Sequence, residues 1–405
     1  MRTAPLRAAS LRAVSARLSV IASSLLFVND SLLMYIPDPS PAALASHLRK
    51  TTGPDEGAVV FLGDAHKDAF SEWERLGAET DCPVVVGLFP GVVDGAHWRH
   101  EGAVVLSVPV QGRPQVLDLT RPVPGPTEAS AAASASFLVL VDGLSEHVGK
   151  ALLWLRDRCG MEHVCVGGGA GRRSMTPGPC LVANETRLQD AAVVIPLAGQ
   201  ADLGVRHGWT RTGTSLVATR TDGAVIEHLN WEPAAEVYAR AVEAHQGAPV
   251  APDAFAEVAA RHPFGLLREG REDIVRDPIA RTDDDGIRCA GPVPENTVLH
   301  VLEGNADALI DAAGQVGAAG KPPESTPDTV FVADCVSRQS YLNDRMDEEL
   351  EAIAAGGRRN DPPPYGVLSI GEIACDGTGH LEWLNKTTVR ASLSTSSETS
   401  PEGSG

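Results

Sequence analysis

The sequence lacks the short cysteine motifs that hold common cofactors. Its seven cysteines stand apart from one another, and none forms a Cys-x-x-Cys or Cys-x-x-Cys-His motif. This absence argues against a zinc knuckle or a thioredoxin-type site, and it excludes covalently attached c-type haem. An odd number of cysteines without framework spacing is typical of a reducing cytosol, so we expect a cytoplasmic protein.

Long apolar runs and an excess of positive charge are also missing. No run of eighteen or more apolar residues occurs, so the sequence predicts no transmembrane helix. Acidic residues number 53 against 34 basic ones, which gives a formal net charge of −19. Because nucleic acids bind proteins largely through phosphate neutralisation, this charge argues against a nucleic-acid partner and against an anionic membrane surface.

Motifs for metals and for nucleotides are absent as well. The histidines show no His-x-His, His-Glu-x-x-His or facial-triad spacing, so we expect no permanent metal site. The glycine-rich segment 167–171 contains neither Gly-x-Gly-x-x-Gly nor Gly-Lys-Ser/Thr, which argues against a nucleotide phosphate. Two interpretations of this expected loop remain open. Bare backbone at Gly168 and Gly169 approaches a ligand, or the glycines serve turns that need positive φ.

What the sequence does contain is a large amount of core-forming material in alternating elements. Its 405 residues are 43% hydrophobic, enough for two or three domains. Short continuous apolar runs predict buried strands, among them 58–62, 83–88, 136–141, 329–333 and 366–372. Between many of these runs, apolar residues recur at the spacing of an amphipathic helix. We therefore expect an α/β fold of α+β character, with two layered domains and mixed, partly antiparallel sheets.

Changes in composition suggest four segments along the chain. Residues 1–33 are rich in Arg, Ser and Ala, which indicates a disordered leader or a wrongly assigned start rather than a targeting segment. A proline-rich stretch near residue 250 separates a first domain, 34–247, from a second, 248–392. Residues 393–405, mostly Ser, Thr, Glu, Gly and Pro, are expected to be a disordered tail.

Reactive residue types gather near the C-terminus. Cys335 ends an apolar strand just before a helix that carries Arg338, and both features lower the pKa of a thiol. A nucleophilic Cys335 with Glu372 or a histidine as base is therefore conceivable. Adjacent Asp334 opposes thiolate formation and no histidine is close in sequence, so we favour a packed cysteine.

A carboxylate that ends an apolar strand needs a partner. Glu372 is expected there, and Arg338 or the strand containing Asn385 could supply the partner. Such a charge pair suits either a pocket for a small zwitterion or a structural clamp. Glu349, on the helix after Arg338, is interpreted as part of a solvated helix face.

A third candidate is the segment containing His207, Gly208 and Trp209, expected within a β segment. A histidine there could bind haem or a metal, and a tryptophan could form the wall of a pocket. A histidine that is merely hydrogen-bonded at a strand end is the alternative.

These motifs, taken together, resemble the FIST family. The resemblance extends over about residues 38–392. It rests on 84–88 with Gly91, 166–169, Asn184, 207–209, 217–219, 234–238, 303–304, Cys335, Arg338, Glu349, 365–366, 371–373 and 385–387. The sequence departs from the family pattern at 87–89, where Gly-Leu-Phe stands in place of a Cys or Ser with small residues.

The resemblance implies a non-catalytic sensor of a small ligand, such as an amino acid or a related metabolite, with no cofactor. Its partner would be a signalling protein such as a histidine kinase, a diguanylate cyclase or a chemotaxis receptor. The candidate ligand contacts are Arg338, Glu372, Cys335, His207, Trp209, Gly168, Gly169 and Asn385. One alternative is a nitric-oxide sensor that binds b-type haem through His207, because some bacterial members of the family bind b-type haem and sense nitric oxide. A protein-interaction scaffold and a Cys335-dependent enzyme are further alternatives.

Overall fold

The computed structural model describes residues 33–53, 56–122, 136–159, 163–319, 327–377 and 381–394. Only Leu33 of the expected leader lies within these ranges, and it begins a strand. Of the expected tail, only residues 393 and 394 lie within them, where they end a strand. Within the described residues, no helix is both long and apolar enough to cross a membrane.

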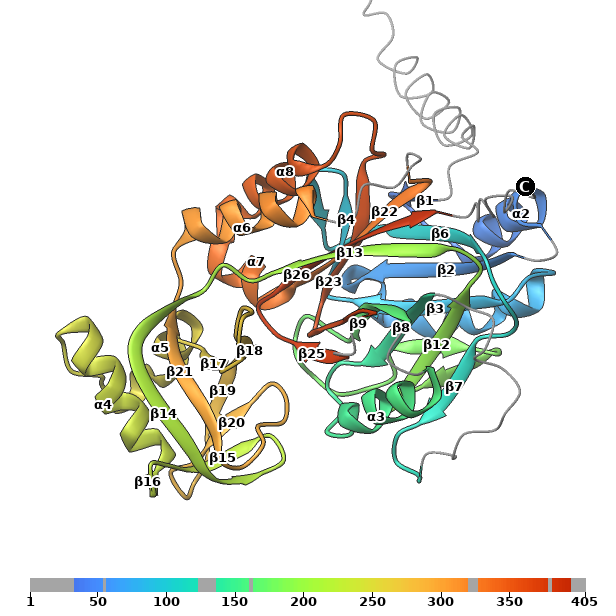
Figure 1. The fold of residues 1–405 in the computed structure, drawn as a ribbon. Helices are drawn as coiled ribbons and strands as arrows, with labels where there is room; N and C mark the ends of the chain where they lie inside the picture. Colours follow the sequence, from blue (N-terminus) through green and yellow to red (C-terminus); the bar gives the residue numbers. More distant parts are fainter. Residues whose placement is uncertain are drawn as a thin grey trace, which may run out of the picture.

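The chain combines helices with runs of consecutive strands, and the α/β class with mixed sheets is confirmed (Figure 1). The helices are α2 (Pro41–Thr51), α3 (Val148–Cys159), α4 (Ala234–Gln246), α5 (Phe255–Arg261), α6 (Ala306–Ala318), α7 (Val336–Leu342) and α8 (Met346–Gly356). The expected strands at 58–62, 83–88 and 136–141 all form, and their side chains are almost all buried. Continuous apolar runs suit strands that are covered on both faces.

Three six-stranded sheets form the body of the molecule. The first contains, in spatial order, β1 (Leu33–Ile36), β6 (Ala103–Pro109), β2 (Glu56–Gly63), β3 (Val84–Phe89), β10 (Leu181–Ala183) and β11 (Thr186–Leu188). The second contains β7 (Gln115–Asp118), β12 (Ala191–Leu197), β8 (Ser136–Asp142), β9 (Val164–Ala170), β24 (Glu372–Asp376) and β25 (Glu382–Leu384). The third contains β13 (Gln200–Arg206), β26 (Thr388–Ser394), β22 (Thr329–Cys335), β23 (Pro364–Ser369), β4 (Gly91–Asp94) and β5 (His97–Arg99).

The three sheets share one plan. In each, the two middle strands are parallel and every other neighbouring pair is antiparallel. The chain therefore repeats the same arrangement three times: β1–β6, then β7–β12, then β13 with β22–β26.

Each repeat also gives its hairpin to another repeat's sheet. Hairpin β4–β5 completes the third sheet, β10–β11 the first and β24–β25 the second. Since every sheet needs a hairpin from elsewhere in the chain, the body is one interlocked unit.

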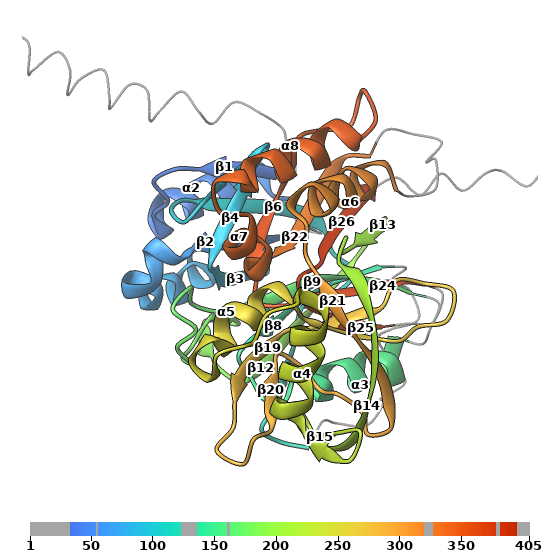
Figure 2. The ribbon, with the colours of Figure 1, turned by 90° about the vertical axis from the view of Figure 1, so that its left-hand side faces the viewer.

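A separate unit is inserted into the third repeat, between β13 and α6. This inserted unit, residues 210–303, carries α4, α5 and an eight-stranded sheet. Its strands are β18 (Ile274–Arg276), β17 (Phe264–Leu266), β21 (Thr297–Glu303), β14 (Thr210–Asp222), β15 (Val225–Leu229), β20 (Ile287–Cys289), β19 (Pro278–Arg281) and β16 (Glu232–Pro233), which pairs with β15. The unit lies at the lower left in Figure 1 and towards the viewer in Figure 2. Strands from both segments expected as domains, 34–247 and 248–392, occur in three of the four sheets.

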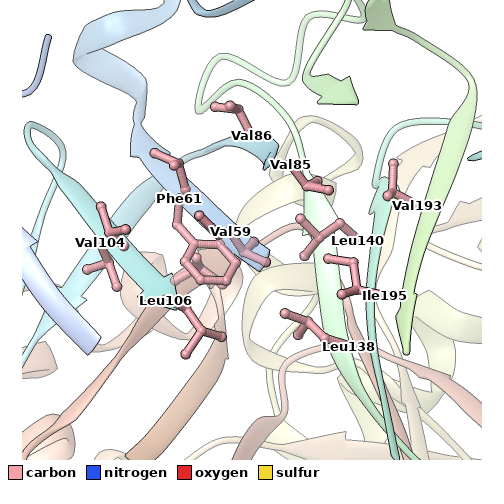
Figure 3. Close-up of a cluster of buried hydrophobic side chains, with 14 of the residues drawn as sticks. Val59, Phe61, Val85, Val86, Val104, Leu106, Leu138, Leu140, Val193 and Ile195 are labelled. Carbon is pink, nitrogen blue, oxygen red and sulfur yellow. The ribbon is translucent and has the colours of Figure 1, made fainter. Parts of the chain in front are cut away.

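Apolar side chains fill the space between the sheets of the body. Figure 3 shows Phe61 of the first sheet facing Leu138 and Leu140 of the second. The Phe61 ring also lies 5.3 Å from that of Phe331 in the third sheet, measured between centroids. The core thus continues through all three sheets.

The chain crosses from the third sheet to the second between β23 and β24, and here the structure corrects two predictions. The expected strand 366–372 is two strands, because the chain leaves β23 in the third sheet and enters β24 in the second at Gly371, whose φ is +82°. The expected loop 167–171 lies mostly within strand β9. Gly168, Gly169 and Gly171 are needed because the crossing segment packs on them: a Cβ on Gly169 would lie 2.1 Å from the Ile370 carbonyl oxygen.

Substituting Gly167 tests a second close approach within β9, which is made to the neighbouring strand β8. A Cβ there would lie 1.8 Å from the Val139 carbonyl oxygen on β8, so backbone would have to move. We expect Gly167→Ala to lower the free energy of unfolding by about 3 kcal/mol or more, measured by urea denaturation. The matched control is Gly149→Ala on α3, where no atom lies within 4 Å of the new Cβ. That helix substitution should stabilise the protein by about 0.5–1 kcal/mol. Equal stabilities of the two variants would contradict the packing account.

Candidate functional site

A cavity of about 1160 Å³ lies between the inserted unit and the body. Its lining residues come from β13, β14, the β17–β18 loop, β21, the end of α6, and the β24–β25 region. They are Leu203, Gly204, Val205, Arg206, His207, Trp209, Arg211, Leu267, Arg268, Glu269, Gly270, Arg271, Glu272, Asp273, Leu302, Ala319, Asp376, Leu384 and Thr387. A cavity of this size that is bounded by two structural units suits a small molecule.

His207 lies in this wall, in the link between β13 and β14 and not in a strand as expected. The chain turns at Gly208, with φ +75°, where a Cβ would lie 2.8 Å from the Ala308 carbonyl oxygen on α6. The His207 side chain is 6% exposed, and its Nδ1 accepts a hydrogen bond of 2.9 Å from the Trp209 backbone N–H. Burial lowers the pKa of His207, as does Arg338, so the ring is neutral near pH 7.

Trp209 is held rigidly beside it. The indole N–H donates to the Lys386 carbonyl oxygen at 3.1 Å, and the Lys386 ammonium lies 5.0 Å from the ring centroid. The Tyr341 ring packs edge-on at a centroid distance of 5.0 Å. A cation–π contact and an edge-to-face contact both favour a single ring position, so Trp209 forms a fixed part of the cavity wall.

Arg338 lies behind the wall and is completely buried. Its guanidinium donates to Glu349 Oε1 at 2.7 Å and Oε2 at 2.9 Å, and also to the carbonyl oxygens of His207, Lys386 and Leu309. The carboxylate that pairs with Arg338 is therefore Glu349. It is not Glu372, for which the sequence had offered Arg338 as one of two possible partners. A bidentate pair with carbonyl acceptors satisfies a buried guanidinium fully.

The interpretation of Glu349 as part of a solvated face was wrong. It shares the buried face of α8 with Met346, Leu350 and Ile353, at helical spacings of three and four residues. A carboxylate within such an apolar stripe was the signal that the sequence offered for this residue.

A second carboxyl lies against the same guanidinium. Asp334 Oδ1 is 3.4 Å from Arg338 Nε, and the Thr388 hydroxyl lies within hydrogen-bond distance of both Asp334 and Glu349. Burial and then the Glu349 charge raise the pKa of Asp334 well above its usual range. One guanidinium balances one carboxylate, so the raised pKa leaves Asp334 neutral beside the Arg338–Glu349 pair.

Glu372 and Cys335 form an adjoining buried group. Glu372 begins β24 and accepts a hydrogen bond of 2.8 Å from the Ser369 hydroxyl. Burial raises the pKa of Glu372 to about 8, and burial likewise raises the pKa of the Cys335 thiol. A thiol in this environment is a poor nucleophile.

Asn385 lies in the turn between β25 and β26, although the sequence suggested a strand. Its Nδ2 donates to the Leu384 carbonyl oxygen, while its buried Oδ1 has no hydrogen-bond partner. The next residue, Lys386, was not predicted as a site residue. Its φ is +49°, and its ammonium reaches across to Asp277 on the inserted unit at 3.3 Å.

The structure thus separates the eight predicted ligand contacts into groups. Of these, only His207 and Trp209 line the cavity. Arg338 touches His207 from behind, while Cys335, Glu372 and Asn385 lie near the β25–β26 turn. Gly168 pairs with Glu372 across β9 and β24, and Gly169 packs on the crossing segment. Among the described residues, no group of three or more His, Cys, Asp and Glu side chains could hold a metal ion.

Two family models match the chain. The model described as the FIST N domain matches residues 58–232, and the one described as the FIST C domain matches residues 234–375. Their boundary falls inside the inserted unit. No curated protein matches the sequence.

The protonated state of Glu372 can be tested by its effect on stability. Its folded pKa of about 8 lies above the ordinary value of 4.5, so the folded protein holds one more proton than the unfolded chain between these pH values. Folding stability therefore falls as pH rises through this window, by at most about 1.4 kcal/mol per pH unit. Glu372→Gln copies the protonated form and removes this dependence. Relative to the unmodified protein, the variant should gain stability from pH 5 to pH 8 in urea melts.

The control for this measurement is Glu351→Gln, at an exposed position on the same α8 helix that holds Glu349. Its stability relative to the unmodified protein should stay constant across the same pH range. A constant difference for Glu372→Gln as well would show that Glu372 is ionised in the folded protein.

Proposed function

The chain belongs to the FIST family, and from that premise we propose that it is an intracellular sensor without catalytic activity. FIST domains are associated with small-ligand sensing in signal transduction. In this proposal the cavity binds an amino acid or a related metabolite. The chain then signals through a partner such as a histidine kinase, a diguanylate cyclase or a chemotaxis receptor.

One observation carries the proposal: His207 belongs both to the cavity wall and to the buried network behind it. Its ring lies in the wall, and its carbonyl oxygen accepts a hydrogen bond from Arg338. A ligand that displaces the 207–209 link would therefore disturb a completely buried guanidinium. Buried charge networks tolerate few arrangements, which makes them suitable two-state elements.

Arg338 extends this connection to two helices. It donates to the Leu309 carbonyl oxygen on α6 and to Glu349 on α8. A partner that reads the position of α6 and α8 would detect occupancy of a cavity that it never touches. Such coupling is allostery in the thermodynamic sense, because ligand and partner bias the same equilibrium.

The chemistry of Cys335 supports the non-catalytic part of the proposal. Its thiol is buried, its pKa is raised, and it does not line the cavity. A Cys335-dependent enzyme would need a thiolate within reach of a substrate.

A thermal-shift screen against amino acids and other metabolites tests ligand binding. A ligand at a hundred times its dissociation constant should add about 2.7 kcal/mol of stability. Glu272→Gln should weaken the shift, because Glu272 lines the cavity and its charge acts on His207. Glu351→Gln on α8 should leave the shift unchanged. A screen without any shift would favour a protein-interaction scaffold instead.

The role of Arg338 predicts a characteristic pattern of stabilities. Arg338→Ala leaves Glu349 buried without its counter-charge, which should cost about 3–5 kcal/mol in urea denaturation. The double variant Arg338→Met with Glu349→Leu removes both charges and should recover most of that loss. If the double variant is as unstable as the single one, the carbonyl acceptors and not the charge pair dominate the energetics of this network.

A further inference from the structure

The cavity wall contains a buried hydrogen-bond donor without a well-placed partner. His207 is more than nine-tenths buried, and its Nε2 makes no hydrogen bond of normal geometry, although the Asp273 backbone lies close enough to raise the pKa of the ring. A buried polar atom left without a good partner destabilises the fold, so its retention beside a cavity is informative.

The proton of the neutral ring can be placed from its neighbour. The Trp209 backbone N–H can only donate, and it donates to His207 Nδ1 at 2.9 Å. Nδ1 is therefore the unprotonated nitrogen, and Nε2 carries the proton. Turning the ring over would place a carbon opposite the Trp209 N–H and leave that buried donor unpaired.

This tautomer is the reverse of the one that a haem-binding histidine needs. A histidine that ligates iron through Nε2 offers its lone pair there and donates its Nδ1–H to an acceptor. In His207 the Nε2 lone pair is absent, and Nδ1 faces a donor. The residues present therefore do not fit a haem bound through His207.

We infer that His207 meets the ligand of the cavity as a hydrogen-bond donor, through Nε2–H to a ligand oxygen, and that it does not ligate haem iron. This inference rests on the proposed ligand-binding function of the cavity. It identifies the ligand class as a small molecule with a carbonyl or carboxylate oxygen.

The charge of the cavity wall agrees with a small polar ligand. Its lining includes four arginines and four acidic residues, namely Arg206, Arg211, Arg268, Arg271, Glu269, Glu272, Asp273 and Asp376. A porphyrin presents two broad apolar faces, and burying them against so many charged side chains would be costly.

A second buried histidine provides the contrast. His300 Nδ1 lies 3.0 Å from Asp273 Oδ2, and the same carboxylate pairs with Arg211. A carboxylate at Nδ1 fixes the proton there, which is the arrangement that iron-bound histidines use. His300 does not line the cavity, however.

The tautomer can be observed directly by NMR of protein labelled with ¹⁵N in histidine only. The signals of His207 are identified by their loss in His207→Gln. We expect one protonated nitrogen, Nε2, and one unprotonated nitrogen, Nδ1, near pH 7. A proton on Nδ1, or on both nitrogens, would overturn the inference.

Titration with haemin tests the exclusion of iron ligation. We expect the unmodified protein and His207→Ala to give the same absorption spectrum. A sharp Soret band that is lost in His207→Ala would overturn the inference. A band that persists in His207→Ala supports it, and His300→Ala then shows whether that haem depends on the other buried histidine.

Neither measurement uses the unknown ligand, so failure of this inference and failure of the proposed function can be told apart. If His207 proves to be an iron ligand while the metabolite screen finds a ligand, the sensing proposal stands and the inference fails. If the screen finds nothing while NMR shows Nε2–H, the proposed function fails although the tautomer is correct.

Discussion

The buried guanidinium of Arg338 is the interaction on which the rest of the site depends. A single, completely buried positive charge holds the Glu349 carboxylate and three backbone carbonyl groups, from His207, Lys386 and Leu309. These acceptors belong to the 207–209 link, the β25–β26 turn and two helices. Because an uncompensated buried charge is so costly, each of these segments is held at its place relative to the others. A displacement of one of these segments therefore disturbs the others.

A different constraint applies to the body, in which three sheets pack around one core. Each repeat completes its neighbour's sheet with a hairpin, and at least one crossing requires chains to approach more closely than side chains allow. Gly167 and Gly169 therefore serve close packing, although their sequence resembles that of a ligand-binding loop. The inserted unit adds the second wall of the cavity, and ion pairs such as Lys386 with Asp277 join it to the body.

Local features were predictable from the sequence, whereas long-range ones were not. Apolar runs such as 58–62 located buried strands well, because periodicity reports local burial. The threefold plan was hidden, since it lies in strand pairing and not in repeated residues. The sequence singled out Arg338 and Glu372, and both are buried, but Glu372 does not pair with Arg338 in the fold. The partner of Arg338 depends on which helix face packs against which strand. The tertiary fold alone brings Glu349 of α8 next to Arg338 of α7.

In the proposed function, occupancy of the cavity is transmitted to α6 and α8 through Arg338. Amide hydrogen exchange with and without a metabolite that stabilises the protein tests this most directly. We expect altered exchange in the cavity lining and also in α8 and around Leu309 of α6, neither of which lines the cavity. Altered exchange confined to the cavity lining, with α6 and α8 unchanged, would contradict it.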